Sequence, residues 1–112
     1  MVMLNKKKCV PCQGGIDPLK NEEISIMMQK LPTKWDVKES KKLIKEYKFN
    51  SYKEAVGFAN KIAILSEEEE HHPYIHINYK TIKIIMFTHK INGLHENDFI
   101  IAAKCDEIHK KD

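Results

Sequence analysis

A long helical stripe in the middle of the chain, ended by a histidine pair and a proline, constrains the fold most. Between positions 55 and 65, apolar residues recur every third or fourth position, which is the spacing of one helix face. They are Ala55, Phe58, Ala59, Ile62 and Leu65. Asn50 or Ser51 can cap this helix, which should end near His71, because Pro73 favours an extended conformation at the residue before it. The fold must bury this face and turn sharply just after it.

The segments on both sides of this helix have the pattern of β-hairpins. Residues 35–49 alternate apolar and polar side chains and are interrupted by the polar residues 39–41. Residues 75–79 and 81–88 are rich in isoleucine and aromatic side chains and predict a second hairpin. Alternation places Ile82, Ile84 and Met86 on one face of its second strand. The other face carries Lys83, Ile85, Phe87 and His89.

Two further helices complete the order of elements. An apolar stripe over residues 21–31 predicts a helix before the first hairpin, ended by Pro32. The turn signal Asn92-Gly93 is followed by a helix over residues 96–109. The order α-β-β-α-β-β-α predicts an α+β fold, in which a four-stranded antiparallel sheet has three helices packed on one face.

Length and composition favour a single domain. The chain has 112 residues, of which 42% are hydrophobic, which suits one core. The residues 1–20, rich in lysine and interrupted by proline and glycine, predict a flexible N-terminal segment, and residues 21–112 form the domain. No apolar run approaches the roughly 20 residues that span a bilayer, and no export signal is found. We therefore expect no membrane association and a cytoplasmic location, with the nucleus as the alternative.

The charge pattern argues against direct contact with nucleic acid. The formal net charge is +3, and all 19 basic residues other than histidine are lysines. Bidentate recognition of phosphate or guanine favours the planar guanidinium group of arginine, which this chain lacks. A nucleic-acid partner is therefore not expected.

The three cysteines do not form a disulfide framework, because their number is odd and no export signal accompanies them. Cys9 and Cys12 have the spacing of half a zinc site or of a redox pair. A second pair of ligands and a preceding strand are both missing, however. We interpret these two residues as free thiols, and Cys105 as a small buried hydrophobe.

Four of the six histidines lie between positions 71 and 89. His71 and His72 follow the central helix and His89 follows the last strand, and sites are commonly built at the ends of such elements. An imidazole can give or take a proton near neutral pH. These three histidines are therefore candidates for proton transfer, whereas His76 should alternate away and lie at the surface.

Glu67 lies four residues before His71, and a carboxylate at this spacing could orient an imidazole. We interpret the glutamates at 68–70 as a solvated helix end. Imidazoles and a carboxylate are also zinc or iron ligands, although adjacent histidines on an extended backbone point to opposite sides. From these residues alone, acid–base chemistry, metal binding and no function all stay open.

A longer pattern extends from the central helix into the last one. It comprises Glu67, His71-His72-Pro73, Tyr79, Thr88-His89, Gly93-Leu94 and Asp98. His89 lies seventeen positions after His72, and Asp98 nine positions after His89. This pattern and its spacing resemble the signature of the pterin-4a-carbinolamine dehydratase family over about residues 21–108. The stretches 9–15, 72–77 and 97–103 look like its bacterial and plant-type branch.

The resemblance implies both a fold and an activity. The family fold has the order of elements predicted above. Its activity is dehydration of 4a-hydroxytetrahydrobiopterin to quinonoid dihydrobiopterin, a hydro-lyase step in tetrahydrobiopterin recycling. By resemblance His71 and His89 are the acid and base, in an order left open, and His72 is the third catalytic residue and positions the substrate. The implied substrate-binding residues are Glu67, His72, Pro73 and Asp98. No metal or other cofactor is implied.

The resemblance also implies partners. Family members are dimers or tetramers, so we expect a homodimer or homotetramer that binds a pterin. Animal members also bind a homeodomain transcription factor. The alternative function is therefore a protein-interaction module, a coactivator-like dimerisation cofactor with or without the enzymatic activity.

Three positions near the pattern need separate interpretation. Asp98, at the third position of the last helix, can cap that helix or shape the site, and we favour the cap. His95 stands where the family usually has Ser or Thr, which should weaken the cap. Ile75 stands where many members have an aromatic residue, and alternation should turn the neighbouring Tyr74 to the other face.

Overall fold

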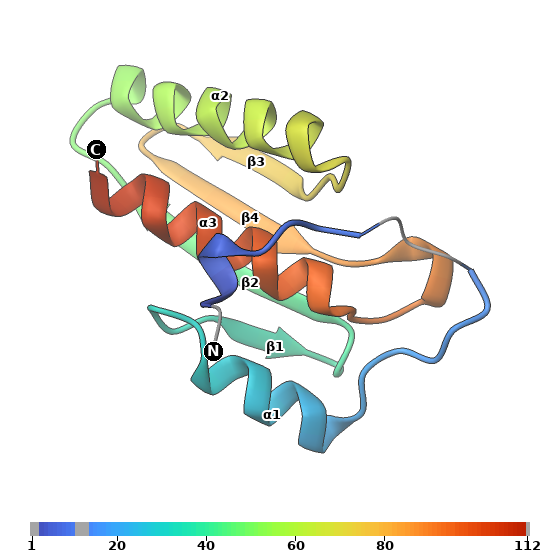
Figure 1. The fold of residues 1–112 in the computed structure, drawn as a ribbon. Helices are drawn as coiled ribbons and strands as arrows, with labels where there is room; N and C mark the ends of the chain where they lie inside the picture. Colours follow the sequence, from blue (N-terminus) through green and yellow to red (C-terminus); the bar gives the residue numbers. More distant parts are fainter. Residues whose placement is uncertain (1–2, 11–13, 112) are drawn as a thin grey trace.

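The structure, a computed structural model, describes residues 3–10 and 14–111 (Figure 1). Its helices are α1 (Asn21–Gln29), α2 (Tyr52–Glu69) and α3 (Glu96–Lys111), and its strands are β1 (Asp36–Lys38), β2 (Lys42–Lys48), β3 (Tyr74–Asn78) and β4 (Thr81–Met86). Two short 3₁₀ helices, η1 (Leu4–Lys6) and η2 (His89–Ile91), precede α1 and follow β4. The predicted order α-β-β-α-β-β-α is confirmed.

The four strands form one antiparallel sheet in the order β1-β2-β4-β3. All three helices cover the same face of this sheet, with α1 near β1, α3 across the middle and α2 near β3 (Figure 1). The prediction of an α+β fold with the helices on one face is therefore confirmed. The last strand ends two residues earlier than predicted. Beyond it, Thr88 pairs with Gly93 as an isolated bridge, and the residues between them form η2.

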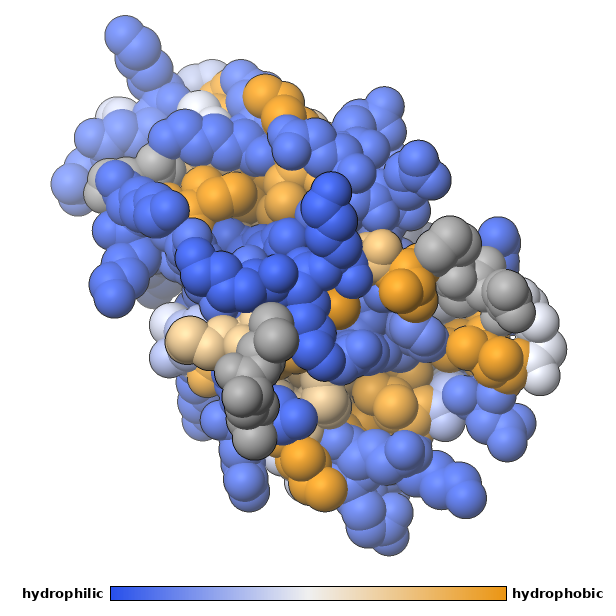
Figure 2. Space-filling view, viewed as in Figure 1, coloured by the Kyte–Doolittle hydropathy of each residue, from blue (hydrophilic) through white to orange (hydrophobic). Residues whose placement is uncertain are grey.

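The core lies between the sheet and the helices. On β4 the predicted apolar face is fully buried, at 0% exposure for Ile82, Ile84 and Met86. The stripe of α2 packs against it through Ala55, Phe58, Ala59 and Ile62. Cys105 is also fully buried, as predicted. Hydrophilic side chains cover most of the helix face, and hydrophobic ones show in separate groups between them (Figure 2).

A buried polar cluster joins α3 to the first hairpin. Asp106 of α3 accepts hydrogen bonds from the Trp35 indole (3.0 Å), the Tyr47 hydroxyl (2.6 Å) and the Lys45 ammonium (3.0 Å). Burial raises the pKa of Tyr47 above its ordinary value of 10.0, and the hydrogen bond to Asp106 adds to this shift. The phenol is therefore a donor and not a charged group, so all three bonds to Asp106 stabilise the fold.

The central helix begins and ends through local backbone chemistry. Ser51 caps α2, and its hydroxyl accepts the N–H of Glu54 at 3.1 Å. At the other end Glu70 adopts the left-handed conformation, with φ of 55°, and its N–H bonds to the Glu67 and Ser66 carbonyls. The chain therefore leaves the helix axis one residue before His71, close to the predicted end.

The first twenty residues make specific contacts where the structure describes them. Leu4 is buried in the core, and Leu19 donates its N–H to the Leu94 carbonyl at 2.9 Å. The flexibility predicted for residues 1–20 stays a prediction, and Cys12 lies outside the described residues. Within residues 3–10 and 14–111, no helix is long and apolar enough to cross a membrane.

Candidate active site

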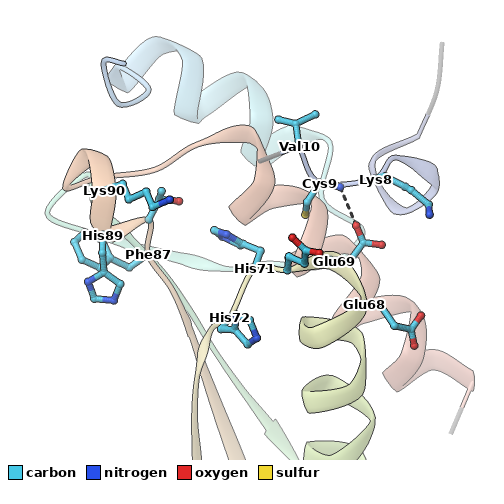
Figure 3. Close-up of a pocket in the computed structure, with 12 residues that line it drawn as sticks. Lys8, Cys9, Val10, Glu68, Glu69, His71, His72, Phe87, His89 and Lys90 are labelled. Atoms are coloured by element: carbon cyan, nitrogen blue, oxygen red, sulfur yellow. Dashed lines mark hydrogen bonds between the residues drawn. The ribbon is translucent and has the colours of Figure 1, made fainter. Parts of the chain in front are cut away.

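A pocket of about 550 Å³ opens where α2 ends, beside the segment that follows β4. Figure 3 shows His71 and His72 at the end of α2, His89 across the pocket, and the N-terminal segment along its upper side. The lining residues are Lys8, Cys9, Val10, Glu68, Glu69, Glu70, His71, His72, Phe87, Thr88, His89 and Lys90. The structure therefore brings the three predicted catalytic histidines to one pocket.

His71 is held by a buried carboxylate. Its Nε2 lies 2.7 Å from Oδ1 of Asp98, and the two side chains are 10% and 0% exposed. An ionised carboxylate accepts hydrogen bonds and cannot donate them, so with Asp98 ionised the proton of this pair lies on Nε2. Nδ1 is then the ring nitrogen left to exchange a proton with a bound molecule. A second group that fixes the tautomer in this way is typical of catalytic imidazoles.

Asp98 also organises the start of α3. Its second oxygen, Oδ2, accepts the Thr88 hydroxyl at 2.7 Å and the His95 N–H at 3.0 Å. The bond to His95 is the capping role that we favoured from the sequence, and the other oxygen of the same side chain bonds to His71 beside the pocket. Thr88 was part of the sequence pattern but had no predicted role, and here it completes the carboxylate's bonding.

His95 caps α3 with its own ring. Its Nδ1 accepts the N–H of Asn97 at 3.0 Å, which is what a Ser or Thr hydroxyl does at this position. His95 therefore does form a cap, because a ring nitrogen can also accept a hydrogen bond, and whether this cap is weaker than that of Ser or Thr stays a prediction. Sequence statistics of caps favour small side chains and do not show this geometry.

Glu67 does not orient His71, which is a correction to the sequence interpretation. Since Glu70 leaves the helix in the left-handed conformation, the four-residue helical spacing to His71 is broken. The Glu67 carboxylate instead lies 2.6 Å from Nε2 of His72. Both side chains are mostly exposed, at 80% and 59%, so the pair stands at the rim, where solvent weakens such a contact.

His89 has an aromatic neighbour that the sequence interpretation placed elsewhere. The Tyr74 hydroxyl lies 2.8 Å from Nε2 of His89, and the ring of Phe87 packs edge-on at 4.7 Å. Alternation along β3 does separate Ile75, which packs against the core, from Tyr74. However, η2 returns His89 to the end of β3 on the Tyr74 side. His76 is exposed, as predicted.

The remaining predicted residues lie around the pocket and not in its lining. Asp98 stands behind His71, Glu67 pairs with His72, and Pro73 is half-buried where β3 begins. Glu69 was interpreted as part of a solvated helix end, and that interpretation is wrong. Its carboxylate bonds to Lys104 at 2.9 Å and to the Cys9 N–H at 2.8 Å.

The described residues show no cluster of three or more His, Cys, Asp or Glu side chains that could hold a metal ion. Each of the three histidines that line the pocket has its own partner: His71 lies beside Asp98, His72 beside Glu67 and His89 beside Tyr74. The pocket geometry thus presents imidazoles with separate partners. Such an arrangement can move protons at two points of one bound molecule.

Residues 17–108 match the family model described as pterin 4 alpha carbinolamine dehydratase. The chain belongs to this family. A relative from Rickettsia canadensis, provisionally named pterin-4-alpha-carbinolamine dehydratase, is 47% identical over 106 residues, which cover 95% of this chain and 97% of the relative. A relative from Rubrobacter xylanophilus with the same provisional name is 43% identical and covers 96% of this chain and 100% of its own.

Two solved structures have the same fold. The crystal structure of a transcriptional coactivator/pterin dehydratase from Brucella melitensis superposes with a TM-score of 0.75 at 27% identity, covering 82% of this chain and 98% of its own. A pterin dehydratase-like protein described as a RuBisCO assembly factor in the alpha-carboxysome has a TM-score of 0.59 at 25% identity, and covers 69% and 90% of the two chains. Membership of the family, and resemblance to its bacterial members, are therefore shown.

Proposed function

We propose that this protein dehydrates 4a-hydroxytetrahydrobiopterin to quinonoid dihydrobiopterin and water, as a hydro-lyase in tetrahydrobiopterin recycling. Family membership supports the pterin substrate and this class of reaction. The observation that carries the proposal is the buried pair of His71 and Asp98 beside a pocket that His89 also lines. A proton donor and a proton acceptor on one pocket are what this reaction requires.

The chemistry requires two proton transfers, one at the hydroxyl on C4a and one at the neighbouring N5. The bond between C4a and the hydroxyl oxygen breaks, and that oxygen takes a proton from a general acid and leaves as water. The proton on N5 passes to a general base, and the electron pair of that N–H bond forms the new double bond to C4a. The substrate is not oxidised or reduced, so no electron carrier enters the balance. His71 and His89 supply the acid and the base.

The other proposed residues bind and position the substrate. We assign His72 to holding the pterin near His71, because His72 lines the same pocket and pairs with Glu67 at its rim. Pro73 fixes the extended exit from α2 that separates the two adjacent imidazoles. Asp98 acts through His71 by holding its Nε2 proton. We place no metal and no other cofactor in this reaction.

The direct test is the rate of dehydration of the 4a-hydroxypterin by the purified protein against the spontaneous reaction. We expect acceleration that a chelator does not change. His71→Ala and His89→Ala should each lower kcat by about a hundredfold or more, the usual contribution of a general acid or base. His76 is an exposed histidine on β3. The variant His76→Ala is therefore the matched control and should keep the full rate. A wild-type rate equal to the spontaneous one would exclude the proposed activity.

The expected assembly and location belong to the same proposal. We infer a homodimer or homotetramer in the cytoplasm. The outer strands of the sheet, β1 and β3, supply edges through which subunits could pair. Light scattering on the purified protein measures the subunit number, and a monomer at micromolar concentration would contradict this part.

The alternative is a protein-interaction module. It is supported by the names of the two solved structures, one a coactivator and the other an assembly factor. A deletion strain separates the two functions. If the inactive His71→Ala variant corrects the growth or assembly defect of the deletion strain as well as the wild type does, the binding role is the main one. If only catalytically active variants correct the defect, the enzymatic role is the main one.

A further inference from the structure

A segment that precedes the residues matched by the family model forms one wall of the pocket. Residues 3–10, called here the N-terminal strap, precede the residues 17–108 that match the family. Lys8, Cys9 and Val10 line the pocket together with His71 (Figure 3). The strap crosses α3, and its first turn is anchored by Leu4, which is 5% exposed in the core. The wall is therefore tied to the body of the protein at both ends.

Asn97 holds the pocket end of the strap through two hydrogen bonds. Its Oδ1 accepts the N–H of Val10 at 3.0 Å, and its Nδ2 donates to the Val10 carbonyl at 2.6 Å. Asn97 is 2% exposed. One buried amide thus satisfies both backbone groups of one strap residue, as a neighbouring strand would. The two bonds together fix the orientation of the Val10 backbone as well as its distance from Asn97.

Glu69 holds the strap from the opposite side. Its Oε1 accepts the N–H of Cys9 at 2.8 Å, and its Oε2 bonds to the Lys104 ammonium at 2.9 Å. Burial by itself would raise the pKa of Glu69, but the Cys9 N–H and the Lys104 charge outweigh it and lower the pKa. Glu69 is therefore a charged acceptor, and charge-assisted bonds of this kind are the stronger ones.

The two anchors stand next to the two members of the catalytic pair. Asn97 immediately precedes Asp98 on α3, and Glu69 is the last helical residue of α2, two positions before His71. The strap therefore bridges the end of α2 and the start of α3. The 2.7 Å bond between His71 and Asp98 spans the same two elements. A change in their separation would lengthen or tilt that bond.

We propose that Asn97 and Glu69 are positioning residues, which hold the strap as a wall of the substrate pocket and thereby keep His71 aligned with Asp98. The inference rests on the proposed dehydration. It predicts a loss mainly in kcat, because the strap acts on the alignment of the proton-transferring group. Misalignment by about 1 Å can lower a rate substantially, and we expect a loss of about tenfold.

Cys9 provides an independent reporter of strap docking. Burial, with the neighbouring Glu69 charge, raises the pKa of the Cys9 thiol to about 12. The thiolate is the form that reacts with iodoacetamide, so the docked thiol should react slowly at neutral pH. Release of the strap exposes the thiol and should speed its alkylation by about tenfold or more. The measurement uses full-length protein carrying Cys12→Ser, and peptide mass spectrometry separates Cys9 from Cys105.

The experiment compares Asn97→Ala, Glu69→Ala and Glu69→Gln with Asn60→Ala, an exposed asparagine on α2. We expect Asn97→Ala and Glu69→Ala to speed Cys9 alkylation and lower kcat by about tenfold with little change in KM. Glu69→Gln keeps an oxygen for the Cys9 N–H and should restore most of both. The control should match the wild type. If Asn97→Ala does not fold, the two Glu69 variants carry the test.

Two outcomes would overturn the inference in different ways. A wild type that dehydrates the pterin, with variants that alkylate faster at unchanged kcat, would show that the strap docks without acting on the site. In that case the proposed function stands and only the positioning role fails. A wild type without dehydratase activity would remove the proposed function and this inference with it.

Discussion

Two buried aspartates on α3, Asp98 and Asp106, are bonded alike and surrounded differently. Each carboxylate accepts three hydrogen bonds, and the two lie eight residues apart, about 12 Å along a helix. The partners of Asp98 are an imidazole, a hydroxyl and a backbone N–H. Those of Asp106 are an indole, a phenol and an ammonium group. The difference between the two sets decides what each carboxylate can do.

Only the Asp98 set contains a group that exchanges protons near neutral pH and borders a pocket. His71 faces the 550 Å³ pocket, whereas Trp35 and Tyr47 are each 2% exposed in the core. The carboxylate at one end of α3, Asp98, therefore orients a reactive side chain. The carboxylate at the other end, Asp106, bonds to side chains buried in the core. The role of a buried carboxylate therefore depends on the chemistry of its hydrogen-bond partners and not on its burial alone.

The largest effect should follow Asp98→Asn. The His95 N–H needs an acceptor, so the new amide should keep its oxygen there and turn its NH₂ toward His71. Nε2 must then accept, and the proton moves to Nδ1, which is the wrong tautomer. We expect kcat to fall about a hundredfold, as it should when His71 itself is removed, and the free energy of unfolding by only about 1 kcal/mol. A variant with near wild-type kcat would contradict the assigned tautomer.

Asp106→Asn should have the reverse effect. It removes the charge that faces Lys45 in a largely buried pair. The indole and the phenol donate to different oxygens of the carboxylate, so the single amide oxygen can accept only one of them. We expect the free energy of unfolding to fall by about 3 kcal/mol, with unchanged kcat for the folded protein. Urea unfolding and the dehydration assay measure the two quantities. A tenfold loss of kcat here would break the comparison.

Removing the hydroxyl group that donates to each aspartate should give a smaller version of the same contrast. Thr88→Val takes a 2.7 Å bond from Asp98, and Tyr47→Phe takes a 2.6 Å bond from Asp106. Each should lower the free energy of unfolding by about 1–2 kcal/mol. Only Thr88→Val should also lower kcat, by about tenfold, because it loosens the carboxylate that holds His71. Equal kinetic effects of both variants would contradict separate roles.

The smallest effect is on the pH dependence of stability. Glu69 has a lowered pKa, so its contribution is present above the ordinary value of 4.5 and is lost as the pH falls below it. Tyr47 has a raised pKa, so its contribution is full below 10.0 and falls as the pH rises above that value. The contribution of Glu69 is thus lost in acid and that of Tyr47 in alkali.

Unfolding at a series of pH values tests this assignment against matched variants. Glu69→Gln should flatten the acid limb alone, and Tyr47→Phe should flatten the alkaline limb alone. If either variant changes the opposite limb, or neither changes its own, the two groups do not control the limbs assigned to them.

Much of the fold follows from the sequence because its signals are local. The stripe of α2, the alternation in β4 and the polar residues 39–41 each depend on neighbours within one element. The end of β4 was placed too late, since residues 87 and 88 keep a strand pattern. There the chain leaves the sheet for η2, and the Thr88 and Gly93 bridge that ends the strand is a contact between two segments.

The candidate site divides in the same way. The sequence pattern identified His71, His72, His89 and Asp98 with the correct spacing, and the family follows from them. It assigned the carboxylate partner of His71 to Glu67, because helical spacing was extended one turn too far. Tyr74, Glu69 and Asn97 were missed, since each acts on a residue distant in sequence. A polar side chain that is buried only after folding leaves no local signal.

By itself the sequence determined which side chains were available for chemistry and on which elements they lie. The tertiary structure decided the pairs: His71 with Asp98, His72 with Glu67, His89 with Tyr74, and Val10 with Asn97. The physical reason is that periodicity and capping act over a few residues, whereas hydrogen bonds to buried groups are selected by packing. With Glu70 in the left-handed conformation, Glu67 lies beside His72 and not beside His71.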